Sequence, residues 1–194
     1  METKKKLGTG AIIGIVVLAI ISVATAFSEG WMSIAYFSPL SIVELVVYLF
    51  MFLSMAYYAL FGYKKPHGNF LRVIIAVFSL NCLSIILDEV ESAYHYDLPM
   101  STVLIFVAGI GLVAILSAYM CGRLDRLKEN VVPIILVTAI MAARSLYYCF
   151  THNIAYGVFE VLWYFSSSVL WLDIVFAYII RYREHKEAGL ADKN

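Results

Sequence analysis

Hydrophobic residues in this chain form six long runs separated by short polar segments. The runs cover residues 8–27, 39–62, 70–90, 100–121, 131–150 and 157–180. Each run approaches the ~20 residues with which a helix crosses a hydrocarbon core of ~30 Å. Because backbone groups must find their partners internally in lipid, such runs predict α-helices. The expected fold class is therefore all-α: a polytopic membrane protein built as a compact bundle of six transmembrane helices.

The segments between the runs are too short to contain a soluble domain. They carry the usual helix breakers, such as Pro66 with Gly68, and Pro99 after Leu98. The sequence therefore predicts a single membrane domain over residues 1–194. A polar tail follows the last run at residues 181–194.

Composition agrees with a bilayer as the solvent for much of the surface. The chain is 62% hydrophobic and 14% charged, whereas soluble domains average about 45–50% apolar and about 25% charged residues. The formal net charge is zero, and the basic residues occur in small scattered clusters. Nothing in this distribution indicates nucleic acid as a partner.

The distribution of Lys and Arg predicts the orientation. Thirteen of the fourteen lie in the N-terminus, in or just after the 62–70 loop, in the 122–130 loop and in the tail, and the other three loops contain none. The positive-inside rule then places both termini in the cytoplasm, with all spans in the cytoplasmic membrane. Alternatively, residues 1–26 are a cleaved signal peptide ending at Ala24-Thr25-Ala26, which leaves five spans.

The fourteenth basic residue, Arg144, lies inside the fifth run. A charged residue at the centre of a span costs ~2.5–3.5 kcal/mol or more, so it usually has a partner and often a function. Helical rise places Arg144 ~9 Å and Glu44 ~8 Å below the outer surface. Glu160 lies in the same slab, and Asp88 and Glu89 are expected to cap the outer end of the third span.

Polar and aromatic residues at helical spacing predict inward-facing stripes on several spans. Two interpretations of Arg144 stay open. It pairs with Glu44 or Glu160 and fixes helix register, or it lines an outward-facing pocket with surplus carboxylates for a cation, an amine or a proton. In the second case it could also bind a substrate carboxylate or phosphate directly. The candidate ligand-binding residues are Arg144, Glu44, Glu160, Asp88, Asn81, Tyr48, Tyr148 and Tyr164.

Asp173 lies deep in the sixth run, flanked by Trp171, Leu172 and Ile174. Transporters use buried carboxyl groups as proton relays, which makes Asp173 a candidate for this role. The alternative is a neutral carboxyl hydrogen-bonded to a neighbouring helix, for example to Tyr57 or Ser117.

Metal and cofactor signals are weak. Glu91, His95 and His152 are expected near the outer surface, but their spacing is unspecific and exposed loop histidines explain it. The three cysteines have no CxxC spacing and are expected to be free. We therefore expect no cofactor and no metal site.

The favoured function is the binding or transport of a small molecule or ion, by a transporter or a substrate-capture subunit. Six spans in fewer than 200 residues resemble the general layout of substrate-binding subunits of energy-coupling-factor transporters, although no motif carries that likeness. The alternatives are an intramembrane enzyme at the outer surface, or an accessory or sensory subunit whose partner is another membrane protein. No motif of a known intramembrane hydrolase is present, so an enzyme is the less favoured interpretation.

Overall fold

The computed structural model describes residues 9–35, 42, 45–53, 68–95, 99–126, 128–151 and 158–187, and this part of the chain is helical without strands. Five long helices are present: α1 (Thr9–Ala35), α3 (Gly68–His95), α4 (Met100–Gly122), α5 (Val131–Thr151) and α6 (Val158–Glu187). Residues 45–53 form a further helical segment. The all-α class expected from the hydrophobic runs is thus confirmed for the described residues.

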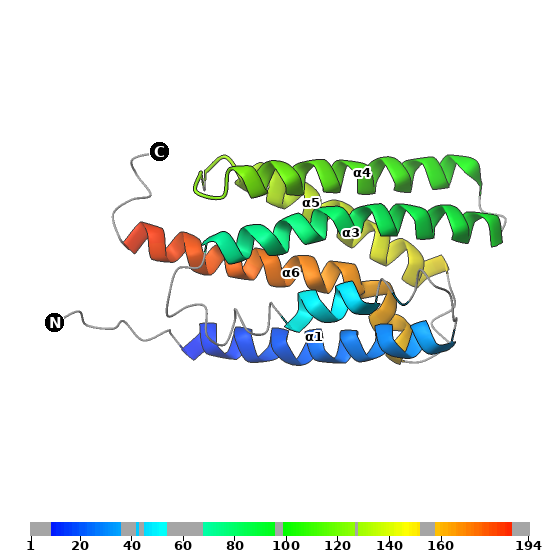
Figure 1. The fold of residues 1–194 in the computed structure, drawn as a ribbon, viewed down its shortest axis with the longest axis horizontal. Helices are drawn as coiled ribbons and strands as arrows, with labels where there is room; N and C mark the ends of the chain where they lie inside the picture. The colour runs from blue at the N-terminus through cyan, green and yellow to red at the C-terminus, as the bar shows by residue number, and fades with distance from the viewer. Residues whose placement is uncertain are drawn as a thin grey trace.

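The long helices lie side by side in a bundle (Figure 1). α3 packs on α4, α4 on α5 and α5 on α6, while a smaller contact between α3 and α6 closes the ring. α1 packs on α6. α6 is therefore the element that joins α1 to the rest of the bundle.

Three of these helices contain segments long and apolar enough to cross a membrane: Leu71–Glu91, Met100–Gly122 and Val131–Thr151. Shorter apolar stretches lie in α1 (Ile12–Ser28) and α6 (Tyr164–Ile179). Large apolar side chains such as Leu104, Ile105 and Phe150 are exposed on the bundle surface. An apolar surface of this kind is expected where lipid, rather than water, is the solvent.

Helix ends differ from the expected ones where no breaker is present. α4 and α5 end within one residue of the expected runs, but α1 continues to Ala35 and α3 to His95. α6 continues to Glu187, into the expected tail. A change from apolar to polar residues marks the expected membrane surface, whereas a helix continues until its backbone is interrupted, so these helices extend beyond the apolar runs. Most of the run 39–62 lies outside the described residues.

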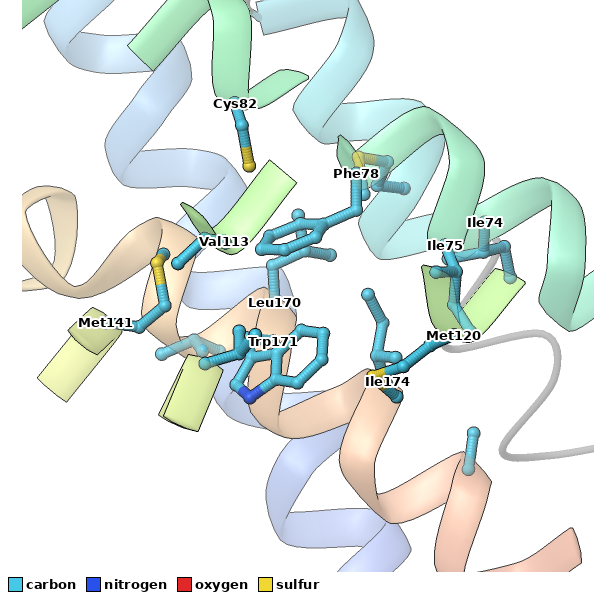
Figure 2. Packing of buried hydrophobic residues seen from close by; sticks show 14 of the residues in the cluster. Ile74, Ile75, Phe78, Cys82, Val113, Met120, Met141, Leu170, Trp171 and Ile174 are labelled. Atoms are coloured by element: carbon cyan, nitrogen blue, oxygen red, sulfur yellow. The ribbon is translucent and has the colours of Figure 1, made fainter. Parts of the chain in front are cut away.

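The core is centred on Trp171 of α6 and Phe78 of α3, which Figure 2 shows facing each other among aliphatic side chains. Both side chains are fully buried, and their ring centroids are 5.4 Å apart at an interplanar angle of 32°. The indole Nε1 donates a hydrogen bond of 2.8 Å to Oγ1 of Thr138 on α5. One side chain thus holds three helices together.

One end of the bundle gathers the start of α3, the turn after α4 and the end of α6 (Figure 1). These segments carry the basic residues Arg72, Arg123, Arg126, Lys128, Arg181, Arg183 and Lys186. Arg72 forms an ion pair of 2.6 Å with Asp125, and Asn130 Nδ2 donates to the carbonyl of Arg123 at 2.9 Å. The helix ends and the turn that carry these basic residues therefore lie at the same end of the bundle.

Candidate functional site

Arg144 forms a buried ion pair with Glu89. Nε of Arg144 donates to Oε1 of Glu89 at 2.5 Å, and the two side chains are 12% and 2% exposed. The pair joins α5 to α3. It lies in the half of the bundle away from the basic end, because Arg144 is about two turns from the C-terminal end of α5.

Two further side chains complete a cluster that we call the Arg144 centre: Glu89, Arg144, Tyr148 and Ser167. The hydroxyl of Tyr148 donates to the other carboxylate oxygen of Glu89. Nη1 of Arg144 donates to Oγ of Ser167 on α6 at 3.4 Å, and the guanidinium lies 5.2 Å from the ring centroid of Tyr148. Both oxygens of Glu89 are therefore engaged, and its charge is balanced by Arg144.

Aromatic rings from three helices surround this centre. Tyr148 stacks on Tyr164 of α6 with centroids 5.7 Å apart and an interplanar angle of 4°. Phe106 of α4 stacks on the same ring at 5.7 Å and 23°. Tyr48, from the helical segment 45–53, is buried and lies within electrostatic range of Arg144. The centre is thus enclosed by flat, partly polar side chains.

Tyr48, Tyr148 and Tyr164 were predicted to line the site; the structure places Tyr148 against Arg144 and stacks Tyr164 on Tyr148. The partner of Arg144, however, is Glu89, which was expected only to cap a helix. Glu44 lies outside the described residues, as do the side chains of Glu160 and Asp88. The two carboxylates expected to pair with Arg144 therefore stay untested in that role.

The sequence pattern predicts an inward polar stripe on α3 through Asn81, Ser84, Asp88, Glu91 and His95. Of these residues Asn81 is buried and Glu91 is exposed, while the side chains of Asp88 and His95 lie outside the described residues. The buried face of α3 also runs through Phe78, Cys82, Ile85 and Glu89. Spacing by three and four residues from Phe78 is the sequence signal that points to Glu89.

Asn81 is buried on α3 about 12 Å along the helix from Glu89. Its side chain is 5% exposed, and within the described residues neither its amide nitrogen nor its oxygen has a hydrogen-bond partner. An unsatisfied buried amide costs about 1–3 kcal/mol. Such a group calls for an explanation, and a ligand is one of the accepted ones.

Sequence reasoning missed a serine cluster next to the Arg144 centre. The hydroxyls of Ser145 and Ser168 lie 2.6 Å apart, and Ser168 also donates to the carbonyl of Met141 at 2.9 Å. Oγ of Ser145 also lies 3.2 Å from the carbonyl oxygen of Tyr164, so its single proton can go to Ser168 or to this oxygen. Because these groups satisfy one another, we assign them to α5–α6 packing.

Asp173 has a different partner from the expected ones. Its Oδ2 accepts a hydrogen bond from the hydroxyl of Ser22 on α1, and both side chains are buried. Tyr57 lies outside the described residues. Ser117 is buried on α4, and its hydroxyl has no partner within the described part of the chain.

The described residues contain no group of three or more His, Cys, Asp or Glu side chains that could hold a metal ion. Of the weak metal candidates, Glu91 is exposed, while His152 and the side chain of His95 lie outside the described residues. The three cysteines are free thiols.

The chemistry available at the Arg144 centre is hydrogen bonding and charge recognition. A guanidinium has five N–H donors in a fixed fork, and the hydrogen bonds to Glu89 and Ser167 use Nε and Nη1 of Arg144. The Arg144 side chain keeps 12% of its surface accessible. Comparison with protein-family models, with curated proteins and with solved structures finds no match for this chain.

Proposed function

We propose that this protein is a six-span protein of the cytoplasmic membrane, forming one membrane domain with both termini in the cytoplasm. The gathering of basic residues at one end of the bundle supports this orientation. The Arg144 centre then lies in the outer half of the membrane.

Cysteine labelling tests the orientation at the two ends of α4. Met100 is 71% exposed at its start and Lys128 is exposed after its end. In a Cys121→Ser background, a membrane-impermeant maleimide should label Met100→Cys in intact cells. It should label Lys128→Cys only after permeabilisation. If only Lys128→Cys is labelled in intact cells, the protein has the opposite orientation to the one proposed.

Within this frame, we propose that the protein binds a small polar molecule or ion at the Arg144 centre, as a transporter or a substrate-capture subunit. The observation that carries the proposal is unused hydrogen-bonding capacity in a buried place. Both polar atoms of the buried Asn81 side chain lack a hydrogen-bond partner within the described residues. If the Arg144–Glu89 ion pair served only to fix the helix register, an unsatisfied amide at Asn81 on the same helix would add no stability.

The aromatic rings support the same proposal. Binding sites for small molecules combine apolar and aromatic walls with a few fixed polar groups. Phe106, Tyr148 and Tyr164 supply such walls, and Arg144 supplies a donor fork suited to a carboxylate or phosphate oxygen. Because Glu89 already balances the charge of Arg144, an uncharged or zwitterionic ligand would also fit without a further counter-ion.

Asn81→Leu separates a binding role from a structural one. Removing an unsatisfied amide should raise the free energy of unfolding of the ligand-free protein by about 1–2 kcal/mol. The same variant should lose any ligand-induced rise in melting temperature. The measurement is a thermal-shift panel of amines, amino acids, vitamins, nucleosides and metal ions on detergent-purified protein.

Asn130→Leu is the matched control, because this asparagine is also buried but its Nδ2 donates to the Arg123 carbonyl. It should lose about 1 kcal/mol of stability and keep the ligand response. If Asn81→Leu is destabilised and still responds to ligand like wild type, Asn81 is a structural residue. If no compound shifts wild type, the binding proposal itself fails.

A further inference from the structure

A second buried carboxyl group, Asp173, lies outside the Arg144 centre. It is 6% exposed about midway along α6, on the side that contacts α1. The hydroxyl of Ser22, itself 1% exposed, donates to its Oδ2. The carboxyl is therefore held between two helices, α1 and α6.

Among the described residues, no side chain with a fixed positive charge contacts Asp173. Within the described residues, its only polar contact is Ser22. α3 and α5, which also pack on α6, carry the titratable groups Cys82, Glu89, Arg144 and Tyr148 on their buried faces. Arg144 and Tyr148 are bonded to Glu89, and neither contacts Asp173.

The remaining polar groups of the α1–α6 contact do not supply that charge either. Thr25 and Ser28 of α1 and Ser166 of α6 are buried hydroxyls, and Thr25 donates to the carbonyl of Ile21 at 2.7 Å. Hydroxyls can hydrogen-bond a carboxylate but cannot neutralise it. A buried charge without a partner is far more costly than a buried hydrogen-bonded neutral group.

The buried carboxyls of Glu89 and Asp173 thus differ in kind. Glu89 is balanced by a permanent cation on a neighbouring helix, at 2.5 Å. Asp173 has only a hydroxyl donor among the described residues, and a bound proton would neutralise it where this part of the chain supplies no cation. We propose that Asp173, held by Ser22 at the α1–α6 contact, is a proton-binding site inside the membrane domain. This inference does not depend on ligand binding at the Arg144 centre.

The test is thermal unfolding of the full-length protein in detergent between pH 5 and 9, at constant ionic strength with choline as the monovalent cation. The folded protein holds one proton that the unfolded chain releases, so wild-type stability should fall as pH rises until the folded carboxyl ionises. The folding equilibrium should change up to tenfold per pH unit relative to Asp173→Asn. Asn keeps an acceptor for Ser22 but cannot ionise.

Each outcome decides the proposal. Parallel pH profiles of wild type and Asp173→Asn would overturn it. If sodium in place of choline restores stability at high pH in wild type alone, the site binds a metal cation and the proton assignment is wrong. Should Asp173→Asn fail to fold, Ser22→Ala keeps the carboxyl and removes its donor. The stability of Ser22→Ala should then fall with pH as steeply as that of wild type but level off at a different pH. If the stability of Ser22→Ala has the same pH dependence as that of wild type, the proposal is overturned.

Discussion

Arg144→Gln should lower the free energy of unfolding by about 3–5 kcal/mol, the cost of breaking a buried ion pair from one side. The substitution leaves Glu89, which is 2% exposed, with a buried charge and only the hydroxyl of Tyr148 as a donor. Thermal unfolding in detergent, calibrated against chemical denaturation, measures the effect.

Two further variants test whether the loss of stability in Arg144→Gln comes from the unpaired charge of Glu89. The double variant Glu89→Gln with Arg144→Gln removes both charges and should recover much of the stability, since a buried pair itself contributes little net stabilisation. Arg126→Gln is the matched control, because Arg126 pairs with Glu129 at 3.3 Å on the exposed surface. Exposed pairs contribute about 0–1 kcal/mol. A double variant less stable than Arg144→Gln would contradict the ion-pair explanation.

Trp171→Ala should cost about 3 kcal/mol, the lower end of the range for truncating a large aromatic core side chain. The lower end applies because lipid, unlike water, gives little apolar transfer energy between helices, so the loss is mainly of packing contacts. The fully buried indole contacts Phe78 and bonds to Thr138. Its removal should loosen α3, α5 and α6 together.

Trp171→Phe keeps an aromatic ring against Phe78 but loses the hydrogen bond from Nε1 to Thr138. It should therefore lower the free energy of unfolding by about 1 kcal/mol. Thr138 still donates to the carbonyl of Ile134 at 2.7 Å in that variant. Trp31→Ala, at a tryptophan that is 64% exposed on α1, is the control and should change stability little. Equal losses at Trp31 and Trp171 would show that the core assignment is wrong.

Much of the fold could be predicted from the apolar runs, because in lipid a long apolar run has few alternatives to a helix. α4 and α5 agree with the expected runs within one residue. The extensions of α1 to Ala35 and of α3 to His95 could not be predicted from hydropathy, since the helix leaves the apolar layer without a break. The buried face of α5 includes Pro133, Val137, Met141 and Tyr148, which recur at helical spacing.

The candidate site could be predicted in part. Arg144 was identifiable because a cation within an apolar run is costly, and Tyr148 because it lies one turn away. Glu89 was missed because Asp88, Glu89 and Glu91 fall in one short segment, and composition alone does not set the rotation of α3. Ser22 was missed as the partner of Asp173 because a serine in an apolar helix gives no charge signal.

The most direct test of the account is ligand-induced stabilisation in three proteins: wild type, Arg126→Gln, and the double variant Glu89→Gln with Arg144→Gln. The double variant has no charge at the Arg144 centre and is expected to stay folded, so a loss of binding in this variant would not result from unfolding. The account predicts that a compound raising the melting temperature of wild type raises that of Arg126→Gln equally and leaves the double variant unchanged. An equal rise in all three would contradict a binding role for the Arg144 centre.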